Sequence, residues 1–303
     1  MSRVPLAGWP HGTAWNAGWQ QQRCHWTNNN GLVVGLAEST TQDPNCVSPQ
    51  VLDYQAVLWR GNAIHKLPPI SGDAIGAAIA VNDYGQIVGG TGMCGSGPGI
   101  GPVFVHAVLW RNHSPTDLGN LGGAFNNVAY AINNRGQVVG ASDLPGDNTA
   151  HGFLWQNGVM TDLGTLPGDF ISFAFGTNDH GQVVGQSCDV NFNCRAFLWQ
   201  DGMMSDLNTW ATGSPLYLIS ASDISSRGEI VGTGVDLSSG EPLAFSAVPC
   251  DEDNAGHQGL QTVAQYPSPV IKLADERRKI VLPESIREVL RRRSGLRGVS
   301  LGE

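Results

Sequence analysis

The sequence predicts an all-β protein, organised as a β-propeller of about five four-stranded blades. The pattern Gly-x-(Val/Ile)-Val-Gly occurs five times, starting at Gly31, Gly85, Gly136, Gly181 and Gly228. A period of about 45–55 residues predicts an array, because one such unit cannot bury its apolar face alone. A composition of 40 glycines and only 14% charged residues in 303 fits a turn-rich β protein.

The third repeat shows why each unit should form four strands. Residues 129–164 contain four short β-branched or aromatic runs separated by turn signals, which is typical of an antiparallel meander. The first turn, 133–136, places glycine where a tight turn needs a positive φ, and Asn157-Gly158 predicts a two-residue hairpin. Trp155 ends the third strand, and we expect it and its equivalents to pack between adjacent sheets. These equivalents are Trp59, Trp110 and Trp199.

The turns between first and second strands and between third and fourth strands are short, and they should share one side of the molecule, the short-turn face. The other connections are long and variable, and they should share the opposite side, the long-loop face. Variable loops on a rigid scaffold commonly carry function. The predicted long loops are 36–54, 90–105, 142–150, 186–195 and 233–242 between second and third strands, and others such as 119–127 and 164–171 between repeats.

Two loops supply the candidate ligand-binding residues, Asp147, Asn148, Asp169 and Phe170. Asp147 and Asp169 each end a Leu-Pro-Gly-Asp sequence. Their carboxylates could bind a cation through loop oxygens, but Pro-Gly is also the central pair of a type II turn, so plain turn formation is the competing interpretation.

The repeats divide the chain into three parts. Residues 1–27 form an atypical N-terminal segment with four tryptophans, 28–249 form the repeat region, and 250–303 form a linker and basic tail. A short helix is expected over 283–290, with Ile286, Val289 and Leu290 on one face, so the tail is either solvated or held against the sheets by that face. The last repeat stops after its third strand at 243–247, and the other terminus could supply the fourth strand and close the ring. An open ring or six sheets are the alternatives.

Six cysteines are scattered through predicted loops and strands, which is compatible with disulfides in an oxidising compartment or with free thiols. Cys188 and Cys194 flank one predicted hairpin loop almost symmetrically, so a bridge across that hairpin is expected. The pairing of the remaining four stays open. These are Cys24, Cys46, Cys94 and Cys250.

Charge and motifs argue against several functional classes. The net charge is −9 although the tail after residue 270 is basic, so the acidic repeat region should not bind nucleic acid. No apolar run reaches the ~20 residues that a membrane span requires. Gly90–Gly95 matches G-x-G-x-x-G but lacks a following helix. His106 and His151 share a repeat position with Arg195, which favours a structural role over metal binding. No catalytic residue, metal or cofactor is assigned.

Several recurring motifs resemble the bacterial HAF repeat. They are the runs ending in Leu-Trp at 106–110, 151–155 and 195–199, Thr-Asp-Leu-Gly at 116–119 and 161–164, and the segment 131–140. The resemblance covers about residues 28–248. It implies an extracellular or surface-displayed repeat protein with no catalytic residues to transfer. Residues 1–10 show no apolar core of an export signal, so this location depends on the resemblance.

The sequence therefore predicts a non-catalytic binding module that uses its long-loop face to bind a glycan, an envelope component or another protein. The alternative is a hydrolase or lyase of the propeller type, with an acid and histidine site in the central channel. An enzyme should place unpaired acids and a histidine from different blades at the channel mouth. A binding module should instead present aromatic or Asn/Asp loop tips.

Overall fold

The computed structural model describes residues 22–42, 52–94, 102–211, 213–249, 260–262 and 281–293. These residues form five antiparallel sheets of four strands each, one short 3₁₀-helix and one α-helix. Each sheet is a simple meander in chain order. The all-β prediction and the four-strand repeat are confirmed.

The strand bounds follow the repeats closely. The first sheet contains β1 (Gln22–Thr27), β2 (Leu32–Gln42), β3 (Leu52–Arg60) and β4 (Ala63–Lys66). The second contains β5 (Ile75–Val81), β6 (Ile87–Cys94), β7 (Pro102–Arg111) and β8 (Ser114–Asp117). The third contains β9 (Asn127–Ile132), β10 (Val138–Asp143), β11 (Ala150–Gln156) and β12 (Val159–Asp162). The fourth contains β13 (Ile171–Thr177), β14 (Val183–Cys188), β15 (Cys194–Gln200) and β16 (Met203–Asp206). The fifth contains β17 (Leu216–Ile224), β18 (Ile230–Asp236), β19 (Pro242–Ala247) and β20 (Leu260–Thr262).

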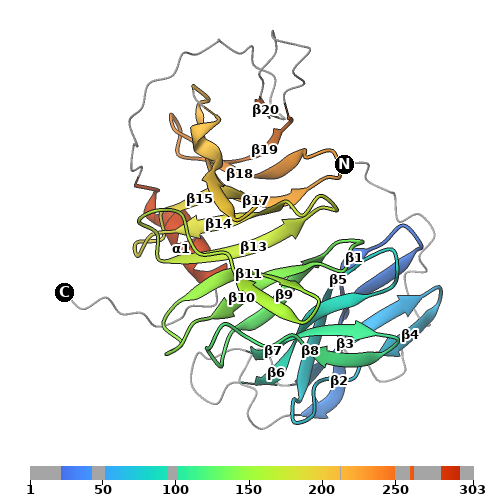
Figure 1. The fold of residues 1–303 in the computed structure, drawn as a ribbon. Helices are drawn as coiled ribbons and strands as arrows, with labels where there is room; N and C mark the ends of the chain where they lie inside the picture. Colours follow the sequence, from blue (N-terminus) through green and yellow to red (C-terminus); the bar gives the residue numbers. More distant parts are fainter. Residues whose placement is uncertain are drawn as a thin grey trace.

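The sheets follow one another in a curved stack, visible in Figure 1 as the change from blue to orange. Their first strands lie side by side, because β5 contacts β1 and β9, and β13 contacts β9 and β17. Within the part of the chain that the structure describes, the first and fifth sheets make no contact of similar extent. Ring closure and the blade number of a propeller therefore stay predictions.

Both ends of the stack differ from the sequence expectation. The fourth strand of the fifth sheet is β20, so it comes from the segment that follows the last repeat and not from the N-terminus. The first sheet begins with β1 at Gln22, inside the segment 1–27 that the sequence sets apart. A three-residue strand without the repeat motif carries too little pattern to be recognised in the sequence.

The structure explains both glycines of the repeated motif. The first glycine of each copy closes the short turn in the left-handed region, with φ of +74° at Gly136. The second glycine faces a β-bulge in the first strand. A Cβ atom on Gly140 would lie 2.0 Å from the carbonyl oxygen of Val128, which no side chain can tolerate. Gly89, Gly185 and Gly232 meet the equivalent carbonyl at 1.9–2.1 Å.

The bulge recurs in the first strand of every sheet, where the register shifts by one residue opposite the second glycine. At a bulge, the side chain of the extra residue points in a different direction from that in a regular strand. In the third and fourth sheets it is aromatic, and the rings of Tyr130 and Phe175 lie 5.6 Å apart. Neighbouring sheets therefore also contact one another through their bulges. Burial in this contact raises the pKa of the Tyr130 hydroxyl to about 12.

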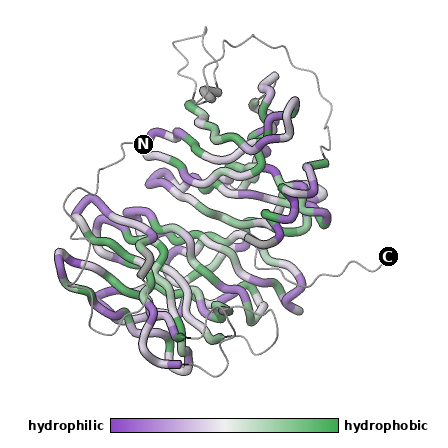
Figure 2. The backbone as a smooth tube through the Cα atoms, turned by 180° about the vertical axis from the view of Figure 1, so that it is seen from behind, coloured by the Kyte–Doolittle hydropathy of each residue, from purple (hydrophilic) through white to green (hydrophobic). Residues whose placement is uncertain are grey.

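Trp110, Trp155 and Trp199 pack between sheets, as predicted. Trp59 does not, because it packs within the first sheet against Val57 and Ile64. Trp110 is buried with Leu58 and Leu67 of the preceding repeat, and its indole Nε1 donates to the carbonyl of Pro68 at 2.7 Å. Trp155 is buried in the same way with Leu109 and Leu118. Apolar segments accordingly run through the sheets and polar segments lie at the turns, as Figure 2 shows.

The tail forms α1 (Glu284–Arg293), which lies against the stack beside the third and fourth sheets (Figure 1). Ile286 and Leu290 are buried, together with Leu282, in a cluster that includes Phe173 and Tyr217. Residues 282–290 are therefore held against the sheets by the apolar face of the helix, although Val289, also predicted on that face, is 51% exposed.

Two polar contacts fix this helix to the β14–β15 loop. The side chain of Asn193 accepts a hydrogen bond from the backbone N–H of Leu282 at 2.9 Å. The guanidinium of Arg291 lies 5.4 Å from the ring centroid of Phe192. Among the described residues, no helix is long and apolar enough to cross a bilayer.

Candidate functional site: the long-loop face of the third and fourth sheets

The candidate site lies where the loops 118–126, 144–149 and 163–170 meet. Both Leu-Pro-Gly-Asp sequences form the expected turns: Asp147 donates its backbone N–H to the carbonyl of Leu144, and Asp169 donates to that of Leu166, each at 3.0 Å. Thr149 Oγ1 donates to the carbonyl of Phe170, which holds the second and third loops together. The two loops that carry the four sequence candidates are therefore in contact.

Asp147 and Asn148 lie at the tip of the β10–β11 loop. The Asp147 carboxylate accepts a hydrogen bond from the backbone N–H of Ala124 at 2.6 Å, so it joins this loop to the β8–β9 loop. The next residue there, Phe125, leaves 55% of its side chain exposed. Asn148 is exposed, and its side-chain amide donates to the carbonyl of Gly146 at 2.9 Å. We call Phe125, Asp147 and Asn148 the tip patch.

Sequence reasoning placed Phe125 in a long loop but did not select it. The available signal was an aromatic residue in a predicted long loop, between Ala124 and Asn126 and close to Gly122 and Gly123. The choice of Phe170 instead followed from its position beside Asp169. The structure separates the two phenylalanines, because Phe170 packs against the cluster beneath α1.

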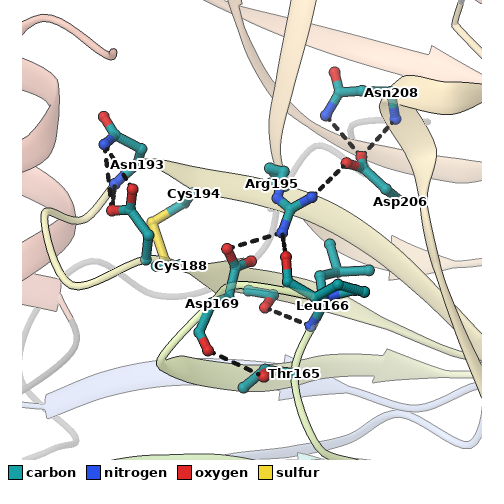
Figure 3. Close-up of polar contacts among 12 residues, drawn as sticks. Thr165, Leu166, Asp169, Cys188, Asn193, Cys194, Arg195, Asp206 and Asn208 are labelled. Carbon is teal, nitrogen blue, oxygen red and sulfur yellow. Dashed lines mark hydrogen bonds and ion pairs between the residues drawn. A yellow bond between two sulfur atoms is a disulfide. The ribbon is translucent and has the colours of Figure 1, made fainter. Parts of the chain in front are cut away.

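Asp169 lies inside an ionic network, not at a loop tip (Figure 3). Its Oδ1 is 2.8 Å from Nη2 of Arg195, and Nη1 of Arg195 is 3.1 Å from Oδ2 of Asp206. The same guanidinium donates to the carbonyl of Pro167. Only 5% of the Asp169 side chain is exposed. This network joins the loop before the fourth sheet to strands β15 and β16.

Burial raises the pKa of Asp169, and the hydrogen bond and charge of Arg195 oppose that rise. Burial alone would lower the pKa of Arg195, but its hydrogen bond with Asp169 reverses that effect and the guanidinium stays charged. Because this carboxylate is buried and paired with Arg195, a ligand at the surface has little access to it.

The equivalent histidines also contact aspartates. His106 Nδ1 is 2.8 Å from Oδ2 of Asp73, and Thr91 donates to the same carboxylate oxygen. His151 Nδ1 is 2.9 Å from Oδ1 of Asp162. Burial tends to raise the pKa of Asp162, but its hydrogen bonds with His151 and with a backbone N–H lower it overall.

This pairing supports the structural interpretation of the shared His/Arg position. In all three repeats the third strand carries a histidine or an arginine whose side chain contacts an aspartate of the fourth strand or of the preceding loop. Among the described residues, no group of three or more His, Cys, Asp or Glu side chains could hold a metal ion.

The predicted disulfide is present. Cys188 and Cys194 are bonded and close the β14–β15 hairpin at the long-loop face. Cys94 is also disulfide-bonded, whereas Cys24 is free and exposed. Cys46 and Cys250 lie outside the described residues, so their pairing is not settled.

No family model and no curated protein matches the chain. Among solved structures, it is similar to the acylaminoacyl peptidase of Pyrococcus horikoshii, with 13% identity and a TM-score of 0.46 over 75% of this chain and 37% of that chain. It is also similar to dipeptidyl peptidase 4 of Porphyromonas gingivalis, with 11% identity and a TM-score of 0.44 over 74% and 35%. The chain thus spans little more than a third of each protein, and at these scores nothing about its activity follows.

Proposed function

We propose that the protein is a non-catalytic binding module of the β-propeller type, which binds its ligand through the tip patch on the long-loop face. The observation that carries this proposal is that some polar groups on that face are paired within the scaffold, whereas others are exposed at loop tips. Asp73, Asp162 and Asp169 are each paired with a histidine or arginine that belongs to the scaffold. The side chains of Phe125 and Asn148 are instead exposed at loop tips.

The composition of the tip patch favours a polar ligand with flat apolar faces, such as a glycan. An aromatic ring offers an apolar platform, and an amide and a carboxylate beside it offer both donors and acceptors. Asp147 is held by its bond to Ala124, so the patch is preorganised and binding loses less conformational entropy. Further apolar tips on the same face, Val190 and Leu237, could extend the surface toward a larger partner.

The proposed location is extracellular or at the cell surface. It is supported by the resemblance of the repeats to HAF repeats and by the bonded Cys188–Cys194 pair, because structural disulfides persist in oxidising compartments. The test is fractionation of the source cells with an antibody against the repeat region. Recovery only from the cytosol would contradict this part of the proposal.

Binding is tested by screening the purified chain on a glycan array, followed by titration of the best hit and an assay for its cleavage. We expect a defined sugar to bind and to be recovered intact. Turnover of that sugar would favour the hydrolase or lyase alternative. Absence of any hit, combined with hydrolytic activity on model substrates, would overturn the binding proposal.

Two variants localise the binding. Phe125→Ser should weaken the affinity for the selected sugar by about tenfold or more, since loss of one aromatic platform is worth roughly 1–3 kcal/mol. Tyr84→Ser is the matched control, because Tyr84 is an exposed aromatic residue in a turn of the short-turn face. Equal losses in both variants would exclude the tip patch as the binding surface.

A further inference from the structure

The fifth sheet lacks the tryptophan that the other four carry. In the second, third and fourth sheets this tryptophan lies near the end of the third strand, opposite the start of the second strand. Trp110 pairs with Ile87, Trp155 with Val138 and Trp199 with Val183. In the fifth sheet, Ala247 pairs with Ile230 at this position. The replacement removes an indole from the interface between the fourth and fifth sheets.

The other interfaces show what the indole fills. Trp110 packs against Leu58, which lies in the third strand of the preceding sheet, and against Leu67, which directly follows its fourth strand. Trp155 occupies the same place against Leu109 and Leu118. An indole wedged in this way buries on the order of 150–250 Å².

At the fourth and fifth sheets the same place is a groove with a volume of about 760 Å³. Its walls include Leu198 and Leu207, the equivalents of Leu58 and Leu67, together with Ile230 and Ala247. Trp210, 60% exposed, adds a free aromatic ring to the lining. Grooves of this size are within the range that binds ligands in proteins.

Polar groups gather at the groove as well. Gln182 donates its side-chain amide to the side chain of Gln200 at 2.9 Å, and both residues line the groove. The short turn at 226–228 lies beside them. Side-chain amides offer both a donor and an acceptor, which is what a peptide backbone requires of a partner.

We propose that this groove binds a tryptophan side chain presented by a partner polypeptide. The indole takes the place that the chain's own tryptophan fills at the three preceding interfaces, and the polar groups meet the main chain on either side of it. A groove larger than one indole favours a peptide over a free ring compound. The site is separate from the tip patch, so neither proposal depends on the other.

The test uses the full chain and the peptide acetyl-Gly-Gly-Trp-Gly-Gly-amide carrying 5-fluorotryptophan, followed by ¹⁹F NMR. We expect saturable binding, and binding about tenfold or more weaker, by competition, for the same peptide with leucine and for N-acetyl-tryptophanamide. No binding of the tryptophan peptide, or equal binding of either control, would overturn the proposal.

The Ala247→Trp variant refills the groove from within. It should reduce the affinity for the tryptophan peptide about tenfold or more while keeping the midpoint of thermal unfolding at or above that of the parent chain. Ala247→Leu fills part of the same space and carries the test if the larger residue prevents folding. Val159→Trp is the control, because Val159 is exposed on a turn of the third sheet. Unchanged affinity in the folded position-247 variant would contradict the proposal.

Discussion

At the residue scale, an asparagine begins the turn between the first and second strands in each of the first four sheets, and it joins that sheet to the next. The Asn133 side chain accepts hydrogen bonds from the backbone N–H groups of Arg135 and Gln137, and its Nδ2 donates to the carbonyl of Asn178 in the next sheet at 2.7 Å. Asn28, Asn82 and Asn178 make the same bond to the following turn at 2.8–3.0 Å. The row ends at Ser225, whose side chain has no amide to donate.

A second row runs beside the first. The backbone N–H of Asp83 donates to the side chain of Asn134, and that of Asn134 donates to Asp179. Asn29 donates both its backbone N–H and its side-chain amide to Asp83. These bonds lower the pKa of Asp83. Because amides alternate with carboxylates, like charges do not meet along the row.

We predict that Asn133→Ala lowers the free energy of unfolding by roughly 2–4 kcal/mol, because buried partners in two sheets lose their hydrogen bonds. Urea unfolding followed by circular dichroism measures it. Asn148→Ala is the matched control and should change stability by less than about 0.5 kcal/mol, since Asn148 is exposed. A similar small loss for both substitutions would show that the row of asparagines does not couple the sheets.

We predict that stability depends on pH through the buried carboxyl group of Asp143. It is fully buried, accepts hydrogen bonds from Asn126 and has a pKa raised by burial. The folded state therefore holds the proton more tightly, so this group favours folding below about pH 4, its unfolded pKa, and that contribution is lost as the pH rises through the folded pKa. Relative to Asp143→Asn, the parent chain should become less stable between pH 4 and 7.

Asp162→Asn gives the opposite sign. The folded pKa of Asp162 is lowered, so its contribution is present above the unfolded pKa and is lost as the pH falls through the folded value. Urea titrations of the three proteins at several pH values measure both effects. If the stability of all three proteins changed with pH in the same way, the pKa of neither carboxyl group would change on folding as described.

At the element scale, glycines have two different structural roles, namely close approach to a neighbouring backbone and a turn with positive φ. Gly140 faces a backbone carbonyl, so Gly140→Ala should cost more than about 3 kcal/mol or prevent folding, because the bulge cannot move away. Gly158 has a φ of +87° but open space around it, so Gly158→Ala should cost only about 1–2 kcal/mol. Thermal unfolding of both variants measures the two losses of stability, and equal losses would refute the distinction.

The β14–β15 hairpin supports α1. Cys188 and Cys194 belong to the same buried cluster as Ile286 and Leu290, so the disulfide lies beneath the helix. Replacing both cysteines with serine should lower stability by about 2 kcal/mol and loosen the helix. Limited proteolysis within 284–293 reports the second effect. Unchanged cleavage there would mean that the helix is held independently of the bridge.

The sequence predicted elements best where the repeat supplied several copies to compare. The turn glycines, the inter-sheet tryptophans and the disulfide could all be read in this way. β20 could not be predicted, because its three residues resemble no other fourth strand. The interior position of Asp169 was also hidden, since a Leu-Pro-Gly-Asp turn looks the same whether its carboxylate faces solvent or Arg195.

At the scale of the whole molecule, two faces differ in their construction. On the short-turn face, hydrogen bonds from the rows that contain Asn133 and Asn134 join each sheet to the next. The long-loop face has local links such as Asp169–Arg195, and its loop tips stay exposed. Its loops, not the turns, can vary without disturbing the stack. We therefore expect the ligand of the proposed binding module to contact the long-loop face.

Hydrogen exchange of the chain with and without its selected sugar tests this claim most directly. We predict slower exchange at 118–126 and 144–149 in the complex and unchanged exchange at the short turns 133–136 and 178–181. Protection confined to the short turns, with the two loops unchanged, would contradict the assignment of the binding surface to the long-loop face.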